Sequence, residues 1–219
     1  NPLENIEKPS PAKKTPAFLS RDEFDALIRA VRSDYAEKED DIYREGLVTW
    51  LIDVFKFAVA TGLRRREIAH LRRRDVDLEN GFVYVRAYGD YSPKSNRDRT
   101  IPLFPMAREA ALSHLEDRSE ESKDSLLFTG YGGEMLNGGY LSHRFLYYRR
   151  EAGLSEDYSF HTLRHTFASW LRMEGIPLDR IRDWMGHASI TQTEVYAHIT
   201  PESVREEGHQ VFPSGDRLS

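Results

Sequence analysis

The stretch GFVYVRAYGDYSPKSNRDRTIPL, residues 81–103, is the part of the chain in which apolar and polar residues alternate. Alternation of this kind is typical of half-buried strands, so GFVYVRAY (81–88) and RDRTIPL (97–103) are predicted to be two strands. The turn-rich segment GDYSPKSN (89–96) would connect them as a hairpin. The remainder shows helical spacing, so we expect a mostly helical α+β domain with one small antiparallel sheet.

Helices are predicted on both sides of this hairpin. Ser20 followed by Glu23 has the spacing of a capping box, which indicates a helix start. Apolar residues then recur on one face of that helix, at Phe24, Leu27, Ile28 and Val31. A second helix is predicted over 42–61, ended by Gly62, and a short one over 65–72. Further helices are predicted over 105–116, 139–151, 161–173, 178–185, 190–198 and 202–207.

Composition limits the classes of protein to consider. The 219-residue chain has no cysteine, which excludes disulfides, thiolate metal sites and cysteine nucleophiles. Its longest apolar run, residues 47–61, is interrupted by Asp53 and Lys56 and is too short to span a bilayer. No signal peptide is apparent, so a cytoplasmic protein is expected. The net charge is −5, yet basic residues cluster in RRRE, RRRD and KSNRDR, which is compatible with DNA binding.

The segment HTLRHTFASWL, residues 161–171, places His161, Arg164 and His165 within one helical turn. Three interpretations compete. A metal site is disfavoured because a zincin-type helix needs a Glu after the first His, and no cysteine completes a site. The histidines could simply be solvated or packed. Alternatively, Arg164 and His161 donate hydrogen bonds to one anion.

The segment TGLRRREIAHL, residues 61–71, places Arg64 where a helix begins, and Glu67 is spaced to hold it with a salt bridge. A solvated run of arginines is the simpler interpretation for Arg65 and Arg66. Lys94 lies in the turn of the hairpin, where a single lysine is usually solvated.

Taken in order, these segments and GHASITQTEVYAHI, residues 186–199, form a recognisable set. Over roughly residues 15–205 the chain resembles the catalytic domain of the tyrosine recombinase (phage integrase) family. The residues that carry the resemblance are Arg64, Lys94, His161, Arg164, His187 and Tyr196. The resemblance implies a tyrosine-recombinase catalytic-domain fold over residues 20–200, preceded by an interdomain linker (1–19) and followed by a helix and tail (201–219).

The resemblance also implies a role for each residue. Tyr196 would be the nucleophile that forms a 3′-phosphotyrosine, with Arg64 and Arg164 on the phosphate oxygens and His187 hydrogen-bonded to one of them. His161 would assist proton removal from Tyr196, and Lys94 would protonate the leaving 5′-oxygen. Glu67 would support Arg64. Further candidate DNA contacts are Arg65, Arg66, Arg97, Arg99 and His165. The hairpin is longer than the family pattern, which leaves Arg97 and Arg99 as alternatives to Lys94.

The expected function is site-specific DNA recombination through a Holliday junction. No metal or other cofactor is expected, because arginines supply the positive charge. The expected partners are a double-stranded DNA recombination site, other copies of the chain in a tetramer on two duplexes, and accessory or directionality proteins, with no membrane. The free protein is expected to be a monomer, and its location nucleoid-associated. The family's N-terminal core-binding domain is expected to lie outside this chain, and 201–219 is either a subunit-docking arm or a frayed end. A type IB topoisomerase-like enzyme and a catalytically silent DNA-binding relative are the alternatives.

Overall fold

A computed structural model describes residues 16–36, 42–89, 91–92, 98–116, 120–130 and 133–199. Lys94, Arg97, most of the predicted linker and the whole segment 201–219 lie outside the described residues. The predicted helix over 202–207 lies outside them as well.

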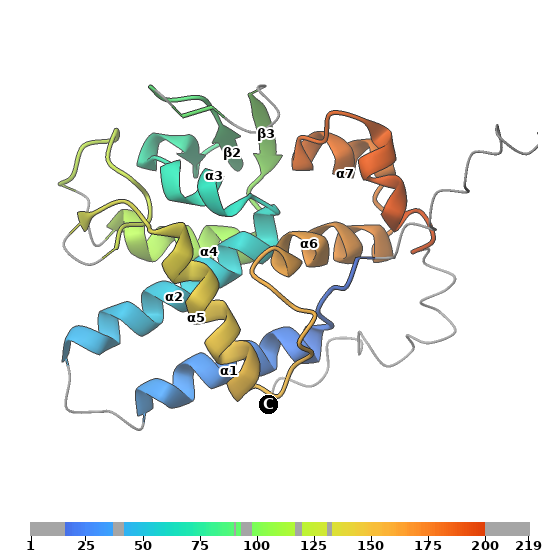
Figure 1. Ribbon diagram of the computed structural model, residues 1–219. Helices are drawn as coiled ribbons and strands as arrows, with labels where there is room; N and C mark the ends of the chain where they lie inside the picture. Colours follow the sequence, from blue (N-terminus) through green and yellow to red (C-terminus); the bar gives the residue numbers. More distant parts are fainter. Residues whose placement is uncertain are drawn as a thin grey trace, which may run out of the picture.

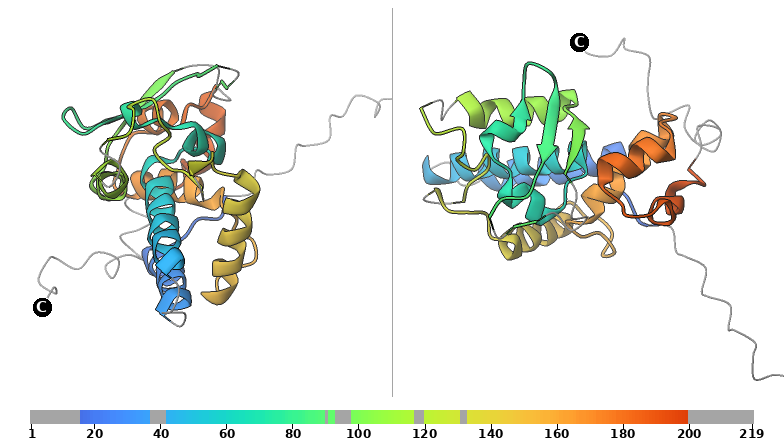
Figure 2. Two further views of the ribbon diagram at one scale, coloured as in Figure 1. Left: turned by 90° about the vertical axis from the view of Figure 1, so that its left-hand side faces the viewer. Right: turned by 90° about the horizontal axis from the view of Figure 1, so that it is seen from above.

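Helix α2 (Ile42–Thr61) is the central element of the fold (Figure 1). It packs against α1 (Arg21–Ala36), α4 (Pro105–Glu116) and α6 (Thr162–Met173). Helix α5 (Gly138–Glu151) packs against α1 and the short α3 (Arg65–His70), and α7 (Leu178–Met185) packs against α6. In two views the sheet and α7 lie on one side of the molecule and α1 on the opposite side (Figures 1 and 2).

The predicted hairpin is present and belongs to a three-stranded antiparallel sheet of order β1-β2-β3. β1 is Val76–Asp77, β2 is Phe82–Val85 and β3 is Arg99–Pro102. In the β2–β3 register, Val83 faces Ile101 and Val85 faces Arg99, and this face is buried. β1 has only two residues, too few to show alternation in the sequence. The predicted fold class, mostly helical with a small antiparallel sheet, is confirmed.

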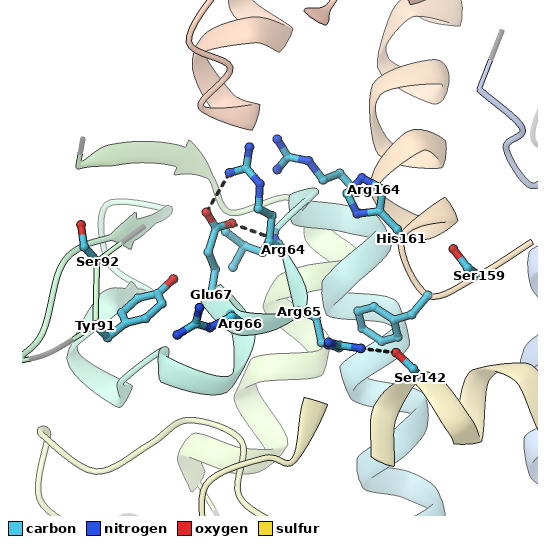
Figure 3. Close-up of a pocket in the computed structure, with 12 residues that line it drawn as sticks. Arg64, Arg65, Arg66, Glu67, Tyr91, Ser92, Ser142, Ser159, His161 and Arg164 are labelled. Atoms are coloured by element: carbon cyan, nitrogen blue, oxygen red, sulfur yellow. Dashed lines mark hydrogen bonds and ion pairs between the residues drawn. The ribbon is translucent and has the colours of Figure 1, made fainter. Parts of the chain in front are cut away.

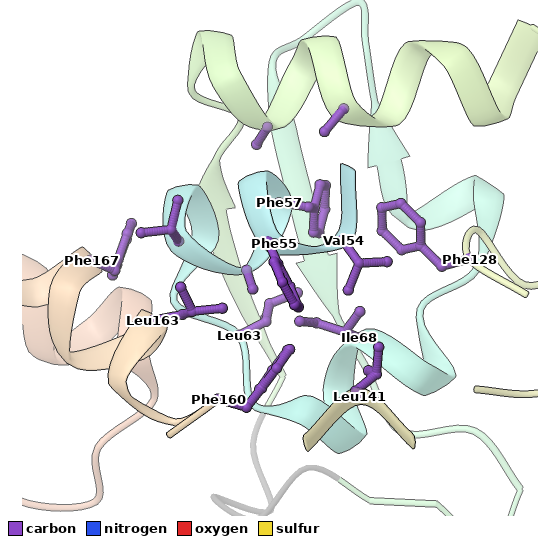
Figure 4. Packing of buried hydrophobic residues seen from close by; sticks show 14 of the residues in the cluster. Val54, Phe55, Phe57, Leu63, Ile68, Phe128, Leu141, Phe160, Leu163 and Phe167 are labelled. Carbon is purple, nitrogen blue, oxygen red and sulfur yellow. The ribbon is translucent and has the colours of Figure 1, made fainter. Parts of the chain in front are cut away.

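Aromatic side chains fill the core between α2 and its neighbours (Figure 4). Phe55 of α2 meets Phe145 of α5 edge to face, with ring centroids 5.7 Å apart, and Phe57 meets Phe128 at 5.2 Å. Edge-to-face pairs of this kind add to the stabilisation that comes from burial alone. The core therefore holds the C-terminal part of α2 in place, and the first residue of the candidate site, Arg64, follows soon after this helix.

Local sequence signals placed several helix ends correctly. Ser20 N donates to Glu23 Oε2 (2.7 Å) and Glu23 N donates to Ser20 Oγ (3.1 Å), which is the predicted capping box. The four apolar residues that follow on α1 are all buried, as predicted. Gly62 ends α2 with φ +62°, a conformation that glycine adopts at little cost.

Two predicted helices differ in the structure. The helix predicted over 65–72 is α3, which ends at His70, and a separate 3-10 turn η1 (Arg73–Asp75) follows it. Residues 190–198 form two 3-10 turns, η3 (Ile190–Gln192) and η4 (Glu194–Tyr196), instead of one helix. β-branched residues dominate this segment and lower its helix propensity; they are Ile190, Thr191, Thr193 and Val195.

Candidate active site

Arg64 lies between α2 and α3 and is held by Glu67. After Gly62 turns the chain, Arg64 becomes the N-cap of α3 with an extended backbone. Arg64 N donates to Glu67 Oε2 (2.7 Å), and its Nη1 donates to Glu67 Oε1 (3.1 Å). The predicted support of Arg64 by Glu67 therefore has a matching geometry in the structure.

Glu67 also pairs with Arg99 of β3. Arg99 Nη1 and Nη2 donate to the two oxygens of Glu67, at 3.0 and 2.6 Å, and Arg99 Nε donates to the Trp184 carbonyl at 2.8 Å. Burial raises the pKa of Glu67, but the hydrogen bonds from Arg99 and the Arg64 backbone and the charges of Arg99 and Arg164 outweigh it, so this pKa lies below its ordinary value. The Arg99 side chain is only 6% exposed. This placement differs from the expectation that Arg99 contacts DNA, because its donors face the protein interior.

Arg164, in the segment HTLRHTFASWL, is buried. Its Nη1 donates to the Gly62 carbonyl and its Nη2 to the Met185 carbonyl, both at 2.6 Å. Burial, followed by the charge of Arg64, lowers the pKa of Arg164 to about 9. The guanidinium thus stays cationic at neutral pH and joins the end of α2 to the end of α7.

Four residues from three separate segments of the chain line one cavity of about 260 Å³, here called the anion cavity. They are Arg64, His161, Arg164 and His187, and Gly186, Ala188 and Gln192 complete the lining. His187 Nδ1 lies 2.8 Å from Thr193 Oγ1. Burial and the charges of Arg164 and Arg64 lower the pKa of His187 to about 3, so its ring is neutral at pH 7. The cavity combines two cationic and two imidazole side chains, a set suited to one phosphate group.

Tyr196 lies beside this cavity but does not line it. It lines a neighbouring cavity of about 380 Å³ that shares His161, Arg164 and His187 with the first, here called the tyrosine cavity. The Tyr196 side chain is 1% exposed, and burial raises its pKa to about 12 despite the opposing charge of Arg164. The structure therefore brings the predicted nucleophile next to the predicted phosphate ligands.

The histidine in contact with the Tyr196 oxygen is His165, not His161. His165 Nδ1 lies 2.6 Å from Tyr196 Oη, and burial lowers the pKa of His165 to about 4, with His161 and Arg164 contributing. His161, at the N-cap of α6, is exposed, and its ring lies edge-on to that of His165 with centroids 4.8 Å apart. His165 was expected as a further DNA contact, and its ring lies against Tyr196 instead.

A larger basin of about 690 Å³ opens from Arg64 across α3 (Figure 3). Arg65 and Arg66, whose contact with DNA stays a prediction, line this basin, and Arg65 Nη1 donates to Ser142 Oγ. Sequence analysis missed Tyr91, which stacks on His70 with ring centroids 3.8 Å apart. Among the described residues, Tyr91 Oη is buried without a hydrogen-bond partner. The one sequence signal for Tyr91 was the unusual length of the hairpin.

Neither a metal cluster nor a membrane span is found in the part of the chain that the structure describes. That part contains no group of three or more His, Asp or Glu residues that could hold a metal ion. None of its helices is long and apolar enough to cross a membrane.

Comparison with known proteins identifies the family. The profile of the phage integrase family matches residues 17–203. The chain belongs to the phage integrase family. It is 27% identical to a tyrosine recombinase XerD of Lacticaseibacillus casei, over 98% of this chain and 69% of that protein. It is 31% identical to a tyrosine recombinase XerC of Halalkalibacterium halodurans, over 94% of this chain and 65% of that protein.

Solved structures of similar fold agree with the family. The XerA recombinase matches with a TM-score of 0.68 and 26% identity, covering 94% of this chain and 67% of that chain. The XerH site-specific recombinase bound to its difH substrate matches with a TM-score of 0.68 and 24% identity. This match covers 95% of this chain and 57% of that chain, and it supports the fold. The chain thus spans about two thirds of the length of the curated relatives it matches.

Proposed function

We propose that this chain is the catalytic part of a site-specific DNA recombinase that cleaves and rejoins DNA strands through Tyr196. One observation carries the proposal: Arg64, His161, Arg164 and His187 line a single cavity, and Tyr196 lies in the cavity next to it. The names of its relatives, tyrosine recombinases XerC and XerD, support the same function.

In this proposal the scissile phosphodiester occupies the anion cavity. Tyr196 Oη attacks the phosphorus, the bond to the 5′-oxygen breaks, and a 3′-phosphotyrosine and a free 5′-hydroxyl result. Negative charge accumulates on the non-bridging oxygens in the transition state, where Arg64 and Arg164 stabilise it most strongly. Lys94 remains our proposed donor of the proton to the 5′-oxygen.

Rejoining follows by the reverse attack. Because the phosphotyrosine bond conserves the energy of the phosphodiester, we propose that no ATP is consumed, and that the arginines make a metal ion unnecessary. Two rounds of exchange through a Holliday junction would recombine two sites, with the chain as a tetramer on two duplexes and a monomer when free. Accessory proteins, a cytoplasmic location at the nucleoid and docking by residues 201–219 belong to the same proposal.

The alternatives predict different products. A type IB topoisomerase-like enzyme would relax plasmid DNA without recombinant products, and a silent relative would bind DNA without a covalent adduct. The relatives are named recombinases, so neither alternative is favoured.

Covalent capture tests the proposal directly. The protein is incubated with nicked duplexes that lose a short fragment after cleavage, and adducts that survive SDS but not protease are collected. We expect an adduct with the wild-type chain and with Tyr147→Phe, an exposed tyrosine on α5, and none with Tyr196→Phe. An adduct with Tyr196→Phe would show that another residue attacks, and no adduct with the wild-type chain would favour the silent relative.

A further inference from the structure

We propose that His165 holds the nucleophilic oxygen of Tyr196 in the free protein and receives its proton during cleavage. This inference rests on the proposed function, because it concerns the same attacking tyrosine. It differs from the role that the family resemblance implies, in which His161 assists removal of this proton.

The geometry separates the two histidines. His165 Nδ1 is 2.6 Å from Tyr196 Oη, a distance typical of a strong hydrogen bond to a hydroxyl. His161 is exposed and lines the anion cavity, the tyrosine cavity and the basin, so it faces the space in which a phosphate would lie. His165 lines only the tyrosine cavity among these three. His161 is therefore placed to bind the phosphate, and His165 to serve the phenol.

The two pKa values make both partners neutral at pH 7, because that of Tyr196 is raised to about 12 and that of His165 is lowered to about 4. In the proposal His165 carries its ring proton on Nε2, so the phenol donates its hydrogen bond to Nδ1. A gap of this size leaves on the order of one phenol in 10⁸ ionised through this bond. In the free protein the contact thus positions Tyr196 and keeps it unreactive.

A bound phosphodiester changes this balance. Apart from burial, the pKa of His165 is depressed by His161 and by the charge of Arg164, which lines both cavities. A phosphate anion in the anion cavity offsets that charge and raises the basicity of His165. At the same time, formation of the bond between Oη and phosphorus makes the phenolic proton far more acidic.

The O–H bond of Tyr196 breaks and its proton moves to His165 Nδ1, while the Oη–P bond forms and the bond from phosphorus to the 5′-oxygen breaks. The leaving oxygen takes a proton from a separate acid. On rejoining, His165 returns its proton to Tyr196 Oη, and the resting hydrogen bond forms again.

The tyrosine segment is also held at a second point by an imidazole. His187 Nδ1 contacts Thr193 Oγ1 at 2.8 Å, between η3 and η4, and the His165 contact lies at the end of η4. The two cavities share Gln192 in addition to His161, Arg164 and His187. The phenol is therefore positioned one cavity away from the proposed phosphate position, on a segment that imidazoles hold at two points.

The test compares His165→Phe, which removes the acceptor, with His165→Asn, whose amide oxygen can still accept the phenolic hydrogen bond but cannot take up a proton. Single-turnover adduct formation on nicked duplexes is followed from pH 6 to 10, and DNA affinity is measured in parallel. General-base catalysis is worth about 10²–10⁴-fold, so we expect both variants to lose at least about 10²-fold in cleavage at pH 7. We expect DNA affinity to be unchanged within about threefold, because His165 does not line the anion cavity.

The pH profile separates proton transfer from a structural defect. Without an acceptor, cleavage requires a phenol that is already ionised, so the rate of both variants should rise about tenfold per pH unit towards pH 10. A wild-type rate in either variant, or a loss that is the same at every pH, would overturn the role of His165. If His165→Phe does not fold, His165→Asn alone decides between these results. Failure of the wild-type chain to form any adduct would instead count against the proposed function itself.

Discussion

Arg99 of β3 and Glu67 of α3 form a two-pronged ion pair with N–O distances of 3.0 and 2.6 Å, and both side chains are buried. The third donor of Arg99 holds the Trp184 carbonyl at the end of α7. Glu67 in turn holds Arg64, and Trp184 lies three residues before His187. Arg99 thus connects the elements that position two of the proposed phosphate ligands.

Replacement of Arg99 by Lys should weaken cleavage without preventing DNA binding. A lysine cannot make the forked contact and the Trp184 contact at once. We expect at least about a tenfold loss of adduct formation. Because the lysine keeps the charge but loses part of the buried hydrogen bonding, stability should fall by about 1–3 kcal/mol. Arg86→Lys, on the same hairpin and stacked 4.5 Å from the Tyr84 ring, is the matched control. A double-mutant cycle with Glu67→Gln tests whether the pair acts as a unit. If the effects of the two substitutions on the cleavage rate simply add, it does not.

Two glycines allow backbone strain to be separated from crowding at the site. Gly186 has φ +63°, and a Cβ there would lie 2.9 Å from Arg99 Cδ; Gly153 has φ +65° with nothing within 4 Å. Alanine in this conformation costs about 1–2 kcal/mol. We expect Gly153→Ala to lose about that much and keep its activity. Gly186→Ala should lose more stability in urea unfolding and should also lose cleavage, because it displaces Arg99 next to His187. Equal losses at both positions would show that Arg99 accommodates the methyl group.

Sequence reasoning was most reliable where the determining contacts are local. Ser20 and Glu23 specify a capping box within one turn, and Glu67 is spaced to reach Arg64. The pairing of His165 with Tyr196 joins residues 31 positions apart, and it depends on how η4 docks on α6. Helical spacing shows which residues share a face with His165, but not what that face will meet.

The inward position of Arg99 could have been predicted from the sequence. Alternating residues of a strand point to the same face, so Arg99 and the apolar Ile101 lie on one side of β3. That face is the buried one, and Arg99 accordingly faces inward against Val85 in the register. An arginine at an inward position predicts a buried acidic partner, which Glu67 provides.

Stability should fall as the pH is lowered from about 6.5. The pKa values of His165 and His187 are about 4 and about 3 in the folded chain, below the ordinary value of 6.5. Between pH 6.5 and these lower values, the two histidines bind protons in the unfolded chain but not in the folded chain. Their contribution to the free energy of unfolding is therefore fully present above pH 6.5 and is lost as the pH falls towards 4 and below. After allowance for partial solvent exposure, we expect a loss of about 2 kcal/mol by pH 5, or about 4–8 °C in Tm.

Thermal unfolding of the wild-type chain and of a double His165→Asn, His187→Asn variant measures this contribution. Carboxylates titrate equally in both proteins, so the difference between the two pH profiles isolates the histidines. The variant should show a shallower fall in Tm between pH 7 and pH 5. Parallel profiles would mean that neither ring is held neutral by the fold.

Tyr91 provides a prediction in which stability and DNA affinity change in opposite senses. Its Oη is buried and has no hydrogen-bond partner among the described residues. Tyr91 lines the basin beside Arg64, Arg65 and Arg66. Burial raises the pKa of Tyr91 to about 12, so the hydroxyl keeps its proton. An unsatisfied buried hydroxyl destabilises a fold by about 1–3 kcal/mol. Tyr91→Phe should therefore stabilise the free protein, while the ring still stacks on His70. If Oη donates to a DNA phosphate, the same change should weaken DNA binding about three- to tenfold.

Tyr88 is the matched control for this experiment, because it lies on the same segment and its hydroxyl already donates to Asp75. Tyr88→Phe removes a made hydrogen bond, so it should destabilise the protein by about 1 kcal/mol. It should leave DNA affinity unchanged, because Tyr88 does not line the basin. Urea unfolding and a DNA titration at one fixed salt concentration measure both quantities for each variant. A Tyr91→Phe protein that is more stable and binds DNA as tightly as the wild type would show that the hydroxyl is buried without a role in DNA binding.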